Sequence, residues 1–272
     1  MPINQLIYDV IVIGASEEGI NFCKQLLAKS TNLKIALVSR NFNRTIEADN
    51  LTKIKQEVIF SSYTYGLIGF TLADRSQIFG LNAVIAIGTK PIKSTLKNCN
   101  IRYDLLDLKT SKLSPVVVAG NNTLAVKYAL TLSKKFKYVY LCSNTLNLEC
   151  DKKYINKLES TANIVHLPNC NIISCKNNKE GDLVEVQLDT YSSIKCMALI
   201  MSLGRTPENA GFLKRILTLD SDGYIVTKDF NETTRVPNVY AIGGCAKNST
   251  KSRLLSTVNR IIDKNNFNPK EE

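Results

Sequence analysis

The chain has 272 residues, of which 44% are hydrophobic, so it can bury a substantial core as one large domain or two moderate ones. A formal net charge of +11 would attract acidic proteins, nucleic acid or anionic cofactors, although compositional drift would give the same excess. We expect no nucleic-acid role, because Trp is absent and no basic run alternates with aromatic residues.

The sequence predicts neither a membrane segment nor a secreted domain. No stretch approaches the apolar length that a spanning helix needs, and no basic leader precedes the first apolar run at residue 8. The eight cysteines are scattered rather than densely and evenly spaced. We therefore expect a cytoplasmic protein whose cysteines are mostly reduced thiols.

Apolar runs of strand length alternate with amphipathic stretches from the first residues onward. Residues 8–13 (YDVIVI) form a nearly continuous apolar run, typical of a strand buried on both faces. Helical spacing over 19–29 and the run at 34–38 (KIALV) complete a βαβ unit. A further buried strand is expected at 82–87 (NAVIAI), ended by a turn at 88–91.

The same pattern returns in the second part of the chain, with a strand at 115–119, a helix at 124–134 and a strand at 138–142. A polar segment from 93 to about 114 indicates a crossing between domains. Later strands are expected at 183–188, 198–203 and 239–242. This order of strands and helices predicts an α/β fold in which two segments begin like nucleotide-binding domains.

The first opening carries a glycine-rich turn, GASEEG, from Gly14 to Gly19. A dinucleotide site needs Gly14 for the tight turn, a very small residue at the place of Ser16 for the pyrophosphate, and Gly19 for close helix packing. Gly14, Ala15, Ser16 and Gly19 are therefore candidate cofactor contacts. A plain strand–helix connection is the alternative.

Five landmarks occur in a fixed order: YDVIVIGASEEG, NAVIAIGTKP, SPVVVAGNNTLA, ALIMSLGRTPEN and VPNVYAIGGCA. In this order the chain resembles the thioredoxin reductase-like family of FAD-dependent pyridine-nucleotide-disulfide oxidoreductases. The resemblance implies two Rossmann-like nucleotide-binding domains, the second inserted in the first. We map residues 1–108 and 214–272 onto the FAD-binding domain and 109–213 onto the inserted NAD(P)-type domain. Relatives are usually homodimers, so a homodimer is expected.

FAD is the cofactor that the resemblance implies, and Gly88, Gly243 and Gly244 are further candidate contacts. The family has a Gly-Asp pair at the place of Gly243 and Gly244, so the acid for the ribityl chain is missing, at a cost of about 1–3 kcal/mol. Ser39 and Arg40 follow the second strand without an acid. Arg40 could contact an adenosine phosphate or be a solvated surface residue. The interval between Gly19 and Gly88 is short for the family, which suggests that the segment near the flavin ring is shortened.

The second turn, which begins at Gly120, departs further, because Asn122 replaces the middle glycine and narrows the approach to a phosphate. The next strand ends at residues 142–144 (CSN). NADPH-dependent relatives carry arginines there, and NAD enzymes carry an acid. The inserted domain therefore binds NADPH or a second nucleotide, or it is structural or re-purposed.

Thioredoxin reductases carry a Cys-x-x-Cys pair just before the second glycine turn, because one thiolate attacks a disulfide and a neighbour resolves it. Only Cys99 lies in that stretch. As a lone thiol it would form a mixed disulfide without resolving it, or it is an incidental linker residue. Cys245 follows the expected flavin-binding turn and is the second catalytic candidate, with a packed small residue as the alternative.

Cys170 and Cys175 are the closest pair of cysteines in sequence. The intervening apolar residues favour ordinary sheet positions for both. A metal site with Cys150 and His166 is a weaker alternative, because the spacing is irregular. We expect no metal.

The leading hypothesis is an FAD-dependent oxidoreductase that passes electrons from ferredoxin or NADPH to a protein disulfide, such as a thioredoxin-like acceptor. Ferredoxins are acidic and would be steered towards a chain of charge +11. One alternative is a non-catalytic nucleotide-binding protein that kept the fold and lost the redox thiols. A third reading, a flavin or ferredoxin reductase without catalytic cysteines, needs a working second nucleotide site.

Overall fold

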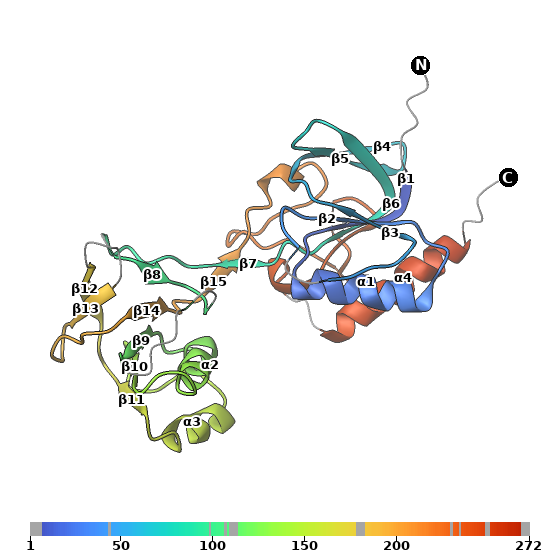
Figure 1. The fold of residues 1–272 in the computed structure, drawn as a ribbon. Helices are drawn as coiled ribbons and strands as arrows, with labels where there is room; N and C mark the ends of the chain where they lie inside the picture. The colour runs from blue at the N-terminus through green and yellow to red at the C-terminus, as the bar shows by residue number, and fades with distance from the viewer. Residues whose placement is uncertain are drawn as a thin grey trace. The chain divides into compact units, whose positions relative to one another are not determined.

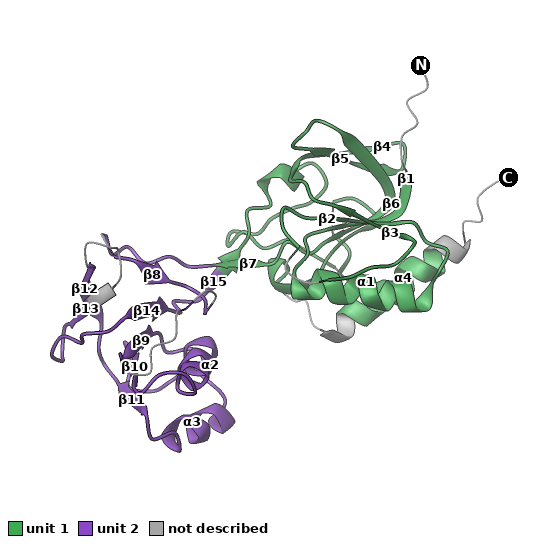
Figure 2. Cartoon of the chain, viewed as in Figure 1, with its two compact units in different colours: residues 1–90, 206–272 green, residues 91–205 purple. Residues whose placement is uncertain are grey.

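The computed structural model describes residues 7–42, 45–97, 99–105, 108, 114–177, 183–228, 231–233, 235–247 and 251–267. The chain divides into two compact units, residues 1–90 with 206–272 and residues 91–205 (Figure 2). The second unit is thus inserted in the first. The boundaries expected near 108 and 213 lie further along the chain than those of the compact units. The two crossing segments, β7 (Thr89–Pro91) and β15 (Arg205–Pro207), pair as a two-stranded sheet.

Unit 1 is built on a seven-stranded sheet, in which six strands have the order β3-β2-β1-β6-β5-β4 (Figure 1). The seventh strand, β16, pairs with β6. Pairing is parallel from β3 to β6 and between β16 and β6, and antiparallel through β5 and β4. The strands are β1 (Ile7–Ile13), β2 (Ile35–Val38), β3 (Leu51–Ile54), β4 (Val58–Thr64), β5 (Leu67–Leu72), β6 (Gln77–Ile85) and β16 (Val239–Ala241).

Strand β1 confirms the prediction of a strand buried on both faces. Val10 and Val12 face one apolar cluster, and Ile11 and Ile13 face the other. The first cluster lies under the helices α1 (Glu17–Lys29) and α4 (Lys251–Phe267), which contact each other. Helix α4 ends at Phe267, and residues 268–272 lie outside the described part of the chain.

Strand β6 is long enough to pair with two different strands along the same side. Its first half pairs with β5, through Gln77 to Gly80. Its second half pairs with β16, where Ile85 lies opposite Ala241. This pairing brings the last landmark of the sequence to the same sheet edge as the first glycine turn. The strands β3, β4 and β5 were not predicted.

Unit 2 contains a parallel sheet with the order β11-β10-β9-β14-β8. Helices α2 (Thr123–Leu132) and α3 (Lys152–Glu159) share an apolar cluster with one face. The hairpin of β12 (Ile172–Asn177) and β13 (Leu183–Leu188) shares a second cluster with the other face. The sheet strands are β8 (Ile101–Arg102), β9 (Val116–Ala119), β10 (Val139–Cys142), β11 (Ile164–Leu167) and β14 (Ala198–Met201).

The fold class and the predicted βαβ openings are therefore confirmed. The polar segment expected as a crossing contributes β8 to the sheet of unit 2. Within the described residues, no helix is both long and apolar enough to cross a membrane.

Candidate functional site

The first glycine turn needs its glycines for steric reasons. Gly14 has φ +107°, and a Cβ there would overlap the carbonyl oxygen of Ala86 in the neighbouring strand connection. A Cβ on Gly19 would overlap the carbonyl oxygen of Gly14. The side chain of Ser16 caps α1 by accepting a hydrogen bond from the backbone N–H of Gly19 at 3.2 Å. The turn is therefore a tight, capped helix start of the dinucleotide type.

A cavity of about 440 Å³ lies beside this turn in unit 1. Its wall combines the turn with the ends of β2 and β3 and with the segment before the 3₁₀ turn η1 (Gly211–Leu213). The polar and small residues in the wall are Gly14, Ala15, Ser16, Ser39, Arg40, Gln56, Glu57, Glu208 and Asn209. A cleft at the carboxyl ends of parallel strands is the usual ligand position in such sheets.

Arg40 lies in this cavity wall, as the prediction of a nucleotide contact requires, and its guanidinium is 3.8 Å from the carboxylate of Glu57. Sequence reasoning missed Glu57, because it looked for an acid directly after the second strand. Because β3 pairs in parallel with β2, Gln56 and Glu57 follow β3 at the same sheet edge. A correct prediction of the strand at 51–54 would have found this acid.

The other predicted glycines gather around the start of α1. Gly243 has φ +71° and opens the 3₁₀ turn η3 (Gly243–Cys245), where a Cβ would come within 2.9 Å of the side chain of Glu18. Gly88 has φ +74°, and its Cβ would lie 3.8 Å from that of Ser16. A Cβ on Gly244 would press on the threonine that follows Gly88. The structure thus brings three of the five landmarks together.

Cys245 is a buried thiol, with 1% of its surface exposed. Its Sγ donates towards the carbonyl oxygens of Ile242 at 3.2 Å and Ile85 at 3.4 Å. Burial raises the pKa of Cys245 to about 11. These are the properties of a packed, protonated thiol, so a catalytic role for Cys245 stays a prediction without geometric support.

The second glycine turn has the same backbone design and different side-chain contacts. Gly120 has φ +144°, and a Cβ would overlap the carbonyl oxygen of Ser202. Asn122 Oδ1 accepts from the backbone N–H of Ala125 at 3.0 Å and from Ser202 Oγ at 2.9 Å. Asn122 Nδ2 donates to the Ser202 carbonyl at 2.6 Å. The amide therefore caps α2 and also bridges to the end of β14.

A carboxylate lies against this second turn. Asn121 Nδ2 donates to Glu149 Oε1 at 3.0 Å and to Thr145 Oγ1 at 3.3 Å, and the Glu149 backbone N–H donates to the Asn121 carbonyl at 2.6 Å. The adjoining cavity, about 260 Å³, is lined by Gly120 and Asn121 among others. A negative group at this point opposes a phosphate.

The position expected to hold a 2′-phosphate carries Ser143 at the end of β10. Ser143 Oγ lies 2.8 Å from His166 Nε2. Burial lowers the pKa of His166, so the imidazole is neutral near pH 7 and offers no positive charge to a phosphate.

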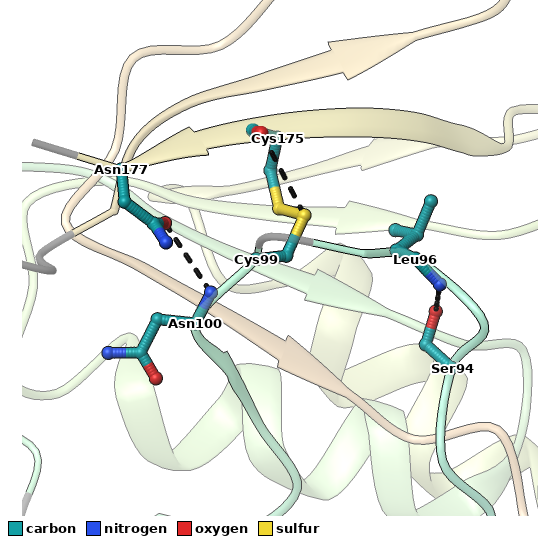
Figure 3. The surroundings of a disulfide bond; sticks show 6 residues. All are labelled: Ser94, Leu96, Cys99, Asn100, Cys175 and Asn177. Carbon is teal, nitrogen blue, oxygen red and sulfur yellow. Dashed lines mark hydrogen bonds between the residues drawn. A yellow bond between two sulfur atoms is a disulfide. The ribbon is translucent and has the colours of Figure 1, made fainter.

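Cys99 is not a lone thiol, which corrects the sequence-based expectation. It forms a disulfide with Cys175 of β12, and the two Cα atoms are 5.7 Å apart (Figure 3). Spacing along the chain gave no signal for this pair, because 76 positions separate the two cysteines. Cys170 and Cys150 are free thiols. Within the described residues, no three His, Cys, Asp or Glu side chains gather as a metal site.

Residues 71–260 match the family described as pyridine nucleotide-disulphide oxidoreductase. The chain is 31% identical over 199 residues to a thioredoxin reductase of Borreliella burgdorferi, covering 69% of this chain and 60% of that one. It is 22% identical over 286 residues to a thioredoxin reductase of Mycoplasma genitalium, covering 90% of each. A ferredoxin–NADP reductase 1 of Oceanobacillus iheyensis is 25% identical over 58% of this chain and 47% of its own length. The matches to the B. burgdorferi protein and to two chlamydial thioredoxin reductases span less than two thirds of those relatives.

Solved structures agree on the fold. A Lactococcus lactis thioredoxin reductase superposes with a TM-score of 0.79 at 13% identity, covering 94% of this chain and 99% of that one. The thioredoxin reductase of T. acidophilum gives 0.76 at 17% identity, covering 94% and 96%. The two glycine turns, the inserted second unit and these matches together show that the chain belongs to the pyridine nucleotide-disulphide oxidoreductase family.

Proposed function

We propose that this chain is an FAD-dependent oxidoreductase that passes electrons from a protein donor to a protein disulfide or a similar acceptor. The observation that carries the proposal is the contrast between the two turns. The first borders a cavity of about 440 Å³, whereas the second borders a smaller cavity of about 260 Å³, and its Asn121 and Asn122 side chains bind Glu149 and Ser202.

The residues of the unit 1 cavity fit the adenosine diphosphate half of FAD. Gly14 allows a close approach to the backbone, and the N-terminus of α1 favours an anionic pyrophosphate. Glu57 offers an acceptor for ribose hydroxyls, and Arg40 offers a cation for a phosphate. Bound flavin would supply the two-electron chemistry that the side chains lack.

The donor in this proposal is a low-potential acidic protein such as a ferredoxin. Asn122 and Glu149 crowd the second turn, and neutral His166 adds no charge for a 2′-phosphate. A net charge of +11 would accelerate encounter with an acidic donor. One relative is a ferredoxin–NADP reductase, whose name includes this donor class together with the pyridine nucleotide.

A non-catalytic nucleotide-binding protein is the second candidate. Glu17 and Glu18 stand in the first turn of α1, where negative charge opposes a pyrophosphate. The acid expected after Gly243 is absent. Both features weaken binding of FAD.

The visible spectrum of the purified protein separates the two candidates. Bound oxidised flavin would give bands at roughly 370 and 450 nm. Their absence, even after incubation with FAD, would exclude the enzyme and leave the nucleotide-binding protein.

Anaerobic stopped-flow reduction tests the donor. A ferredoxin should reduce the flavin rapidly at low salt and much more slowly at high salt, because exposed charges are screened beyond about 8 Å at physiological ionic strength. NADPH and NADH should both be slow. Fast, saturable reduction by NADPH would restore the pyridine nucleotide as donor.

A further inference from the structure

The Cys99–Cys175 disulfide differs in redox state from every other cysteine of the chain. The remaining six cysteines are free thiols. A Cα separation of 5.7 Å lies within the ordinary range for a disulfide, about 4.4–6.8 Å. In the cytoplasm, where the sequence leads us to expect this protein, a disulfide is usually transient and serves catalysis or redox sensing.

The pair is open to a partner molecule. Cys99, between β7 and β8, and Cys175, in β12, are both partly exposed. Five of the free thiols are buried, and Cys150 alone among the free ones is partly exposed. Cys175 packs against the apolar cluster under the β12–β13 hairpin. Cys99 is not part of this cluster, so we expect an incoming thiolate to attack the Cys99 sulfur.

Contacts beside the disulfide would keep the two segments adjacent after reduction. The backbone N–H of Asn100 donates to Asn177 Oδ1 at 3.4 Å, next to the disulfide (Figure 3). Cys99 Sγ lies 3.8 Å from the carbonyl oxygen of Cys175, which can accept a hydrogen bond from a Cys99 thiol. We therefore expect the two sulfurs to stay close enough after reduction for the disulfide to form again.

We propose that Cys99 and Cys175 form a redox-active pair that exchanges electrons with a protein carrying two neighbouring thiols. The first partner thiolate attacks Cys99 Sγ, the Cys99–Cys175 bond breaks, and Cys175 leaves as a thiolate that takes up a proton. The second partner thiolate then attacks the partner's own sulfur in the mixed disulfide and releases Cys99, which is also protonated. Two electrons enter the pair, and the partner becomes a disulfide.

This exchange is independent of flavin, so it extends the proposed function without resting on it. The test uses the purified full chain, exposed to air and freed of added thiols. Free thiols are counted by mass spectrometry after alkylation in denaturant, before and after native incubation with reduced thioredoxin as probe. The count should rise from six to the eight cysteines of the sequence, whether or not the preparation contains flavin.

A thioredoxin variant with a single active-site thiol should become trapped on the peptide that contains Cys99. Cys99→Ser should abolish trapping, whereas Cys150→Ser, which removes the other partly exposed cysteine, should leave it intact. Thermal unfolding checks that each variant is folded, and the counts on the unmodified chain need no variant. A count of eight before reduction, a disulfide that opens only in denaturant, or trapping on Cys175 would each overturn the proposal. A missing flavin spectrum would leave it untouched.

Discussion

The glycine turn after β1 in unit 1 and the glycine turn after β9 in unit 2 have similar backbone conformations. They differ in the contacts of their middle residues, Ser16 and Asn122. In each, a glycine with positive φ lies against a carbonyl oxygen, of Ala86 for Gly14 and of Ser202 for Gly120. The middle residue caps the following helix in both turns. Short Ser16 makes a single capping bond at 3.2 Å. Asn122 also binds the end of β14.

A helix cap and a bound phosphate can use the same backbone N–H groups at a helix start. A longer capping side chain satisfies more backbone groups and fills the room that a phosphate would occupy. The turn of unit 2 has one more side-chain contact, because Asn121 also donates a hydrogen bond to Glu149. Both units have the sheet and the capped helix start, so the fold alone does not show whether a turn binds a ligand.

The largest effect is expected for Gly14→Val, in the first glycine turn. A side chain would meet the Ala86 carbonyl at a backbone conformation that L-residues rarely adopt. The free energy of unfolding should fall by more than about 3 kcal/mol, with loss of bound flavin. Denaturant unfolding and the visible spectrum measure both.

Gly66→Val is the matched control, because Gly66 also has positive φ but no atom lies within 4 Å of its Cβ position. It should cost only about 1–2 kcal/mol and leave flavin bound. Normal flavin content in Gly14→Val would show that the cofactor lies elsewhere.

Glu232→Gln should have the next largest effect, on the second segment of unit 1. Glu232 is 3% exposed and binds Arg260 at 3.0 Å, Lys264 at 3.3 Å and the Asn238 backbone N–H at 3.1 Å. Removing the charge leaves these cations without their buried partner, at a cost of about 2–3 kcal/mol. Lys228→Gln, which removes a more exposed contact at 3.6 Å, should cost under about 1 kcal/mol. Equal losses of stability in the two variants would contradict the view that the buried contacts of Glu232 stabilise unit 1.

Acid should weaken unit 1 through the same carboxylate. Burial acts to raise the pKa of Glu232, but the hydrogen bond from Asn238 and the charges of Lys264 and Arg260 outweigh it and hold the pKa below its ordinary value. The folded pKa is depressed, so the stabilisation is present above the unfolded pKa of about 4.3 and is lost as pH falls through the folded pKa. The contacts of Asn122 and Ser202 in unit 2 do not titrate. Unfolding measured from pH 7 to 3 should show a flatter profile for Glu232→Gln than for the parent chain.

Continuous apolar runs allowed the central strands to be predicted. Strands β1, β9 and β10 are buried on both faces, so their composition alone identifies them. Strand β3 has Thr52 and Lys53 exposed at the sheet edge, which hides it among polar residues. Missing β3 also hid Glu57, one of the two acids of the cavity wall.

Contacts between distant parts of the chain could not be predicted from sequence. Cys99 and Cys175 meet only because β12 folds back over the sheet of unit 2. Nothing in local spacing specifies such a pairing. The hydrogen bonds of Asn122 depend in the same way on Ser202, which is 80 residues away in sequence.

Alanine at the two capping positions sharpens the comparison of the turns. Asn122→Ala removes the cap of α2 and both bonds to Ser202, and should lower the free energy of unfolding by about 1–2 kcal/mol. Ser16→Ala removes one longer bond and should cost about 0.5–1 kcal/mol. Denaturant unfolding of both variants tests the order. A larger loss for Ser16→Ala would contradict the view that the second turn exchanged ligand space for stability.

The smallest effect is expected for Cys245→Ser. This variant tests whether the packed thiol of unit 1 is inert, in contrast to the reactive pair proposed in unit 2. A serine hydroxyl can donate to the same carbonyl oxygens of Ile85 and Ile242, so stability should change by less than about 1 kcal/mol. With a pKa of about 11, only about one Cys245 in ten thousand is a thiolate at pH 7, too little for a nucleophile. Flavin content, flavin reduction and thiol exchange should therefore match the parent chain, and maleimide should label Cys245 far more slowly than reduced Cys99. A variant that binds flavin normally but no longer transfers electrons would instead place Cys245 in the chemistry, and its burial would then have to be relieved when the donor or acceptor binds.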